Sequence, residues 1–297
     1  MPGLGGRQPR FVEHFAGALD RLGDPRPAQR VGALRTLAAL GQSHVDQRPA
    51  IVDVFSAYLR TPGDDEPVRR VAAQILAEHL RPDRPTFWPG ISLDLARAQL
   101  ADLDLSGCRV EGHLRLDGAV LTGQAKLRGL SVGTASLRGV TFTDHAWLER
   151  SVFAGAAAFD GSVFQGDAWF GEASFGGWTT FGGVDFGGHA WFGGCTFRAP
   201  LDFTQAVFRR STGFRGAVAH AGVGLGGTTF LGPARVSRRD EAWNVIAPGW
   251  RVVVDPDNAS VGNLLWVGHP ELVDTPDAAG NAPTQVVEAD TPTQIIQ

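Results

Sequence analysis

The 297-residue chain has little of several residue types that carry chemistry or cross-link a fold. It contains two cysteines and one tyrosine, and Lys126 is the only lysine among its 27 basic residues. Two cysteines are too few for a disulfide framework or a cysteine-rich zinc site. Only 20% of the residues are charged and the formal net charge is -4. No overall field therefore favours an anionic partner, and we expect no direct binding of nucleic acid.

Long hydrophobic runs are also missing. No apolar segment approaches the roughly 20 residues that a membrane-spanning helix needs. The first ten residues have no apolar stretch of the kind found in a secretory signal. We therefore expect no membrane association and a cytoplasmic location.

Glycine and phenylalanine are abundant, with 39 and 18 residues, and most of both lie where a large apolar residue returns every five or six positions. Neither a helix nor a strand has this period, so it indicates a repeat in which the chain turns a corner every few residues. We call these residues anchors. The most regular of them are Leu148, Phe153, Phe159, Phe164, Phe170, Phe175, Phe181, Phe186, Phe192, Phe197, Phe203, Phe208 and Phe214.

Two further patterns predict a narrow, four-sided coil. A small residue stands two positions before nearly every anchor, and glycine is frequent two positions after it, as tight corners require. Trp147, Trp169 and Trp191 are separated by 22 residues each, which equals four anchor steps. If 22 residues make one coil, equivalent positions stack at ~4.8 Å, the spacing of paired strands. The 23 anchors from Leu95 to Phe214 then make nearly six coils.

These units resemble the pentapeptide-repeat proteins, in which a central Leu or Phe stands in the motif Ala-Asp/Asn-Leu-x-x. Leu93-Asp94-Leu95 and Leu103-Asp104-Leu105 are close to that form, and the later Ala-Trp-Phe units are similar to a Phe-rich variant. The segments 28–34 and 79–82 also resemble the helical region that precedes such repeats in a bacterial subfamily. The resemblance implies a right-handed quadrilateral β-helix over about residues 91–231.

Residues 10–81 show helical periodicity instead. Apolar residues recur at steps of three and four in four runs, which predicts an α-helical, HEAT-like domain. Gly41 is expected to close the second helix. Three prolines within residues 82–90 indicate a stiff joint, and we expect Trp88 in this joint to plug the first coil.

The period disappears after Gly232. Residues 232–254 are expected to form a cap over the last coil, because an open β-edge invites self-association. Residues 255–297 have seven acidic residues and no Lys or Arg, which predicts an acidic, disordered tail. The whole chain is thus expected to be of mixed class: helices, β-helix and tail.

The tryptophans stand one residue before the anchors, where side chains should face outward. Trp147, Trp169 and Trp191 are therefore a candidate contact surface for a protein partner. The alternative is a ladder of rings that stabilises the coil without a partner. Lys126 and Gly213 hold the equivalent places in the flanking coils, so the column is confined to the middle of the rod.

A second column contains His145, Asp167 and His189, two residues before the tryptophans. Imidazoles and a carboxylate are plausible ligands of zinc or another divalent ion. The outer histidines are about 9.6 Å apart at the backbone, however, and must lean inward to share an ion. The alternative is a solvated ladder held by charge-assisted hydrogen bonds.

Cys108 and Cys195 both occupy the small inward position, four coils apart in one column. That separation, roughly 19 Å at the strand spacing, excludes a disulfide, so we expect two reduced core residues.

The resulting expectation is a non-enzymatic scaffold or protein-interaction module without a cofactor. Its partner is an unidentified protein, and self-association through a solenoid end is allowed. A first alternative, suggested by the resemblance, is a gyrase-binding DNA mimic, which requires an acidic face; residues 91–231 contain 12 acidic and 11 basic residues. A second alternative is a metal-dependent enzyme that uses His145, Asp167 and His189.

Overall fold

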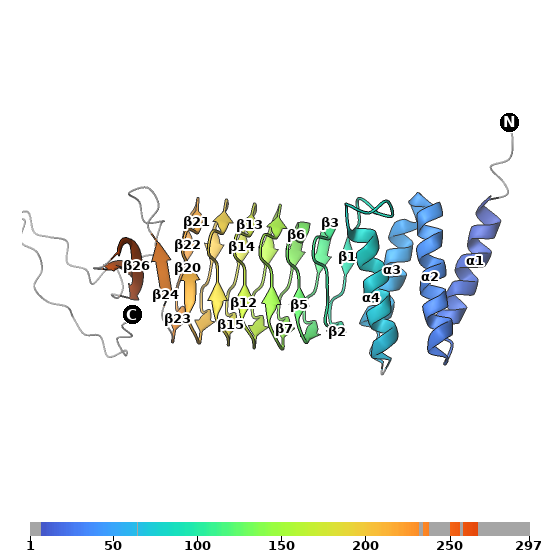
Figure 1. Ribbon diagram of the computed structural model, residues 1–297, viewed down its shortest axis with the longest axis horizontal. Coiled ribbons are helices and arrows are strands. Elements are labelled where there is room, and N and C mark those ends of the chain that lie inside the picture. Colours follow the sequence, from blue (N-terminus) through green and yellow to red (C-terminus); the bar gives the residue numbers. More distant parts are fainter. Residues whose placement is uncertain (1–6, 64, 232–233, 238–249, 256–257, 267–297) are drawn as a thin grey trace, which may run out of the picture.

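The computed structural model describes residues 7–63, 65–231, 234–237, 250–255 and 258–266. Four helices form one end of the molecule, and a β-solenoid of about six turns extends from them along one axis (Figure 1). Among the described helices, none is both long and apolar enough to cross a bilayer.

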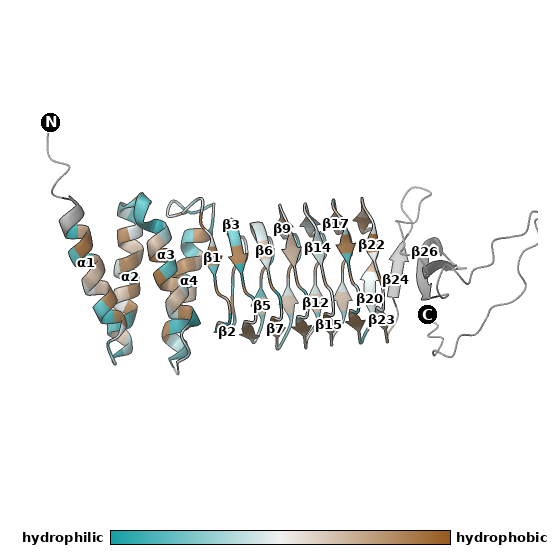
Figure 2. Cartoon of the chain, turned by 180° about the vertical axis from the view of Figure 1, so that it is seen from behind, coloured by the Kyte–Doolittle hydropathy of each residue, from teal (hydrophilic) through white to brown (hydrophobic). Residues whose placement is uncertain are grey.

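Each of the four helices carries both polar and apolar residues (Figure 2). They are α1 (Arg7–Leu22), α2 (Pro27–Ser43), α3 (Arg48–Arg60) and α4 (Glu66–Leu80), with a short 3-10 helix at Val45–Gln47. Prolines in the first turns of α2, α3 and α4 suit positions whose backbone N–H has no helical partner. The predicted end at Gly41 is wrong, because α2 continues to Ser43.

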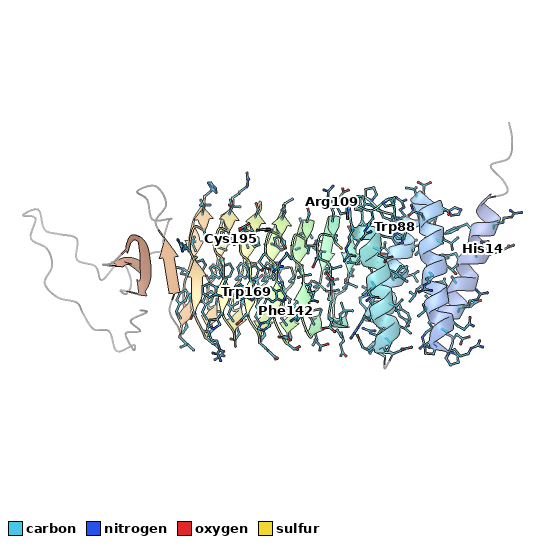
Figure 3. The ribbon with its side chains drawn as sticks, viewed as in Figure 1. His14, Trp88, Arg109, Phe142, Trp169 and Cys195 are labelled. Carbon is cyan, nitrogen blue, oxygen red and sulfur yellow. The ribbon has the colours of Figure 1, made fainter. Side chains whose placement is uncertain are left out.

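Trp88 explains why a glycine stands inside α2. A Cβ atom at position 41 would lie 2.6 Å from the Trp88 ring, so only glycine leaves room for the indole. Trp88 is fully buried, donates from Nε1 to Gln42 Oε1 at 3.0 Å and stacks on His79 with ring centroids 4.0 Å apart. The expectation that Trp88 plugs the first coil is therefore wrong: its ring is inserted among the helices, beside the start of the solenoid (Figure 3).

The solenoid has four columns of short parallel strands. One column, here called the tryptophan face, contains β5 (Ala125–Lys126), β8 (Ala146–Trp147), β12 (Ala168–Trp169), β16 (Ala190–Trp191), β20 (Thr212–Phe214) and β24 (Ala234–Ser237). The column before it contains β2 (Gln99–Ala101), β4 (Val120–Thr122), β7 (Thr141–Phe142), β11 (Val163–Phe164), β15 (Asp185–Phe186), β19 (Val207–Phe208) and β23 (Thr229–Phe230).

The other two columns are joined through two longer strands, β3 (Arg109–Arg115) and β6 (Ser131–Ser136), which run around a corner. The column after the tryptophan face continues with β9 (Val152–Phe153), β13 (Ser174–Phe175), β17 (Thr196–Phe197) and β21 (Val218–Ala219). The column opposite the tryptophan face contains β1 (Leu93–Asp94), β10 (Ala157–Ala158), β14 (Thr179–Thr180), β18 (Leu201–Asp202) and β22 (Val223–Gly224).

The strand register confirms the 22-residue coil and refines it. Ala168 pairs with Ala146 and Ala190, a step of 22, whereas Leu93 pairs with Leu114, a step of 21. The anchors fill the interior, with leucines in the first coils and stacked phenylalanines from Phe142 onward (Figure 3). A typical pair, Phe170 and Phe192, has ring centroids 4.8 Å apart and planes 7° from parallel.

The corner glycines are of two kinds. Some, such as Gly118 and Gly139, have φ near +65°, a conformation that side chains with a Cβ rarely adopt. Others allow successive coils to approach: a Cβ at Gly188 would lie 2.4 Å from the carbonyl carbon of Gly166. Both kinds follow from turning a corner at the strand spacing.

The helices cover the first coil through charged contacts. Arg60 pairs with Asp94 at 2.7 Å, and the buried Arg69 donates to the carbonyl oxygen of Gln99 at 2.6 Å. The backbone edge that a solenoid exposes at its first coil is thus covered, as an edge needs to be to avoid self-association.

At the other end, β24 pairs antiparallel with β26 (Asn258–Trp266), which pairs with β25 (Trp250–Asp255). The tail predicted to begin at Asp255 therefore starts too early, because residues 258–266 form a strand. The acidic composition hid this segment, which carries Val261, Leu264 and Leu265. The predicted cap falls partly, and the rest of the predicted tail entirely, on residues outside the described part.

Candidate interaction surface

Trp147, Trp169 and Trp191 lie directly above one another on the tryptophan face. Their strands pair in register, Trp169 with Trp147 and with Trp191. The ring centroids are 5.7 Å and 5.9 Å apart, with interplanar angles of 6° and 25°. All three side chains are half-buried, so the column is both a stacked ladder and a partly accessible surface. Figure 3 labels Trp169, the middle ring.

The local sequence forces the rings outward. In each unit an alanine precedes the tryptophan and a large anchor follows it, and both are buried. Successive residues of a strand point to opposite faces, so the residue between two inward positions must face outward. Stacking then covers the ring faces and leaves part of each ring exposed, although Nε1 of Trp169 is buried without a hydrogen-bond partner in the described part of the chain.

The two ends of the column differ. At the first end, the Arg128 guanidinium lies 5.5 Å from the Trp147 ring centroid and pairs with Glu149 at 2.8 Å. At the other end, the ring of Trp191 lies over Gly213, where a Cβ would meet a ring atom at 2.5 Å. Position 213 must therefore be glycine for Trp191 to lie flat.

Exposed arginines stand at both ends of the strand that contains Gly213. Arg210 precedes β20 and Arg215 follows it, and neither has an ion pair within the described part of the chain. The last ring of the column is thus next to two cations that have no carboxylate partner among the described residues.

His145, Asp167 and His189 also form a column, in which the side chains of His145 and Asp167 bind backbone amides, whereas Nδ1 of His189 is buried without a hydrogen-bond partner in the described part of the chain. His145 Nδ1 accepts a hydrogen bond from the Asp167 N–H at 3.0 Å, and Asp167 Oδ1 accepts from the His189 N–H at 2.8 Å. The Nδ1 lone pair of His145 is therefore occupied. Across the described residues, no group of three or more His, Cys, Asp or Glu side chains is arranged to hold a metal ion. The geometry is that of a hydrogen-bonded ladder.

Carboxylates on the solenoid are accompanied by arginines. Arg138 pairs with Asp160 at 3.3 Å, Arg150 with Glu172 at 2.9 Å, and Arg209 with Asp185 at 2.7 Å. A DNA mimic requires a row of uncompensated negative charge. The described coils instead alternate the two signs along the corner columns, and the tryptophan face itself carries Lys126 and Arg128.

The two cysteines are core residues, as predicted. Both are free and fully buried, and burial raises the pKa of each thiol to about 12. Cys195 donates to the carbonyl oxygen of Phe170 at 3.0 Å. Neither thiol is therefore available as a nucleophile at neutral pH.

Trp178 was not singled out from the sequence. Its side chain is 61% exposed, and among the large apolar residues that the structure describes only Val12 is equally exposed. It lies at a corner next to β14, in the column opposite the tryptophan face. Its position three residues after the anchor Phe175 could have indicated this exposure, because the residues there belong to a corner of the coil. Its neighbours in the adjacent coils are Ala156 and Pro200, so no second aromatic ring stacks on it.

The fold and its register define a β-solenoid protein with a helical N-terminal layer. Residues 148–196 match the family model described as "Pentapeptide repeats (9 copies)". The solenoid is therefore a pentapeptide-repeat solenoid, and the strand register extends the same coil on both sides of the matched segment. No significant match was found among curated proteins or solved structures.

Proposed function

We propose that this chain is a non-enzymatic protein-interaction module and that Trp147, Trp169 and Trp191 are its contact surface. The observation that carries the proposal is the geometry of this column: three indole rings stacked in register, each of them half-buried. Tryptophan and arginine are the residues most enriched where binding energy concentrates, and this column has both.

A catalytic role has less support. The cysteine thiols are buried with raised pKa values, and His145 Nδ1 is occupied by a backbone amide. A rod with short, tight corners offers flat faces on which water is not excluded from a reacting group. The same flat faces suit contact with another protein.

The proposal is tested by immobilising the purified chain and identifying by mass spectrometry the proteins it retains from host lysate. The test variant is Trp147→Ala/Trp169→Ala/Trp191→Ala. The matched control is Trp178→Ala, which removes an exposed tryptophan from the opposite side. Circular dichroism and melting must show that each variant is folded.

We expect at least one protein to be retained by the wild type and by Trp178→Ala but lost by the triple variant. Equal retention by all three proteins contradicts the proposal and assigns the tryptophan column a purely structural role.

A further inference from the structure

We propose that residues 267–297 of the same chain bind along the tryptophan column and compete there with a partner. This inference rests on the proposed function, because it gives that surface its regulator. The segment meets the surface in three respects: charge, attachment and composition.

Charge is complementary at the Trp191 end of the column. Between residues 267 and 297 the chain has no Lys or Arg, and its acidic residues are Glu271, Asp274, Asp277, Glu288 and Asp290. On the tryptophan face, Arg210 and Arg215 flank Gly213 without a carboxylate partner among the described residues. Arg128, in contrast, is already paired with Glu149. An acidic segment is therefore attracted most strongly to the Trp191 end.

The segment is attached to the same sheet as the tryptophans. β26 pairs with β24, with Asn263 opposite Arg235, and Arg235 lies one step beyond Gly213 in the column. Trp147 is four coil steps from that point, ~19 Å at the strand spacing. A chain of 31 residues spans up to about 100 Å when it is fully extended. Residues 267–297 can therefore reach every ring.

The composition of the segment suits a surface on which indole rings lie near arginines. Apolar residues occur in pairs, each near an acidic residue or the chain end: Leu272 and Val273, Val286 and Val287, and Ile295 and Ile296. Because the segment and the surface belong to one chain, the contact is intramolecular, and linked sites reach effective concentrations in the mM range, at which weak contacts suffice for occupancy.

The test places a bimane label, which an indole quenches on near contact, at Ala289→Cys of the full chain. Cys108 and Cys195 are buried with raised thiol pKa values, so the label enters only the new cysteine. The test variants are Arg215→Glu and Trp147→Phe/Trp169→Phe/Trp191→Phe, which keeps aromatic rings in the column. The matched control is Arg198→Glu, because Arg198 is exposed but follows β17 in another column.

We expect a quenched label in the parent chain, independent of protein concentration. Arg215→Glu should lower the ratio of quenched to free label about fivefold, the size expected for an exposed ion pair, and the Phe variant should reduce quenching to the level that the five remaining tryptophans cause. Arg198→Glu should leave it unchanged.

An unquenched label in the parent chain, equal quenching in the Phe variant, or quenching that rises with protein concentration overturns the proposal. The last result would mean that the segment binds a second copy. Lysate capture is read separately: a partner lost by the Trp→Ala variant leaves the proposed function standing even when the label is unquenched.

Discussion

The helical layer and the solenoid are stabilised in opposite ways. In the helices, the buried contacts do not repeat: Trp88, for example, fits against a glycine of α2 and the imidazole of His79. In the solenoid, the same contact recurs from coil to coil, as Phe159 on Phe181 and Phe181 on Phe203. Yet the buried residues of both parts form one continuous hydrophobic cluster. A repeated interior tolerates no local collapse, whereas a single irregular joint concentrates sensitivity at a few positions.

The largest effect is expected inside the solenoid. Phe181→Ala should lower the free energy of unfolding by about 3–5 kcal/mol, because the rigid coils above and below cannot close the cavity. Urea denaturation followed by circular dichroism measures this. A loss no larger than that caused by an exposed substitution would show that neighbouring coils can collapse.

A smaller effect is expected at the end of the tryptophan column. Gly213→Ala should cost about 1–3 kcal/mol, because the new methyl group overlaps the Trp191 ring. Near-ultraviolet circular dichroism should change at the same time. Gly193→Ala is the control, since its Cβ would meet its nearest neighbour, the Arg215 carbonyl oxygen, at an ordinary 3.5 Å. Equal spectra for both variants would contradict the stacking.

The stability of the protein should depend on pH through His79, which stacks on Trp88 in the joint. Burial lowers the pKa of His79 from its ordinary value of 6.5, so the folded state resists protonation more than the unfolded state. As pH falls through 6.5, the unfolded chain binds a proton that the folded chain does not, and stability decreases. Melting of wild type and His79→Gln across pH 5–8 checks this. The slope contributed by position 79 should vanish in the variant, and an unchanged slope would contradict the assignment.

The smallest effect is expected at the surface. Arg150→Ala removes the pair with Glu172, but both side chains are well exposed, so the change should be about 0–1 kcal/mol. Chemical denaturation measures it. A larger loss would mean that the corner charges act as a connected network.

The solenoid could be predicted from its sequence because the period of the apolar residues directly gives the number of residues in each coil. The 22-residue step placed Trp147, Trp169, Trp191 and Gly213 in one column, and the order of the anchors placed Lys126 at its other end; the register confirms each place. Only the 21-residue step of the first coils was not anticipated.

The irregular parts could not be predicted in the same way. A glycine such as Gly41 is typical of a helix end, but here the need for glycine comes from the Trp88 ring, 47 residues away in the chain. β26 pairs with the preceding strand β25 and with β24, and it was missed because the acidic composition of residues 255–297 was given more weight than its apolar residues. Residue spacing likewise placed His145, Asp167 and His189 in one column, but it does not specify which atoms of the neighbouring coils their side chains bind.

The central claim, that the tryptophan column is a contact surface, is tested most directly without removing any ring. Gly171→Glu/Gly193→Glu adds two side chains next to the column, at positions where a Cβ meets only ordinary contacts. The variant should no longer capture from host lysate the partner that the wild type retains. Its melting temperature should change by no more than a surface substitution would change it. Undiminished capture by this folded variant would contradict the claim.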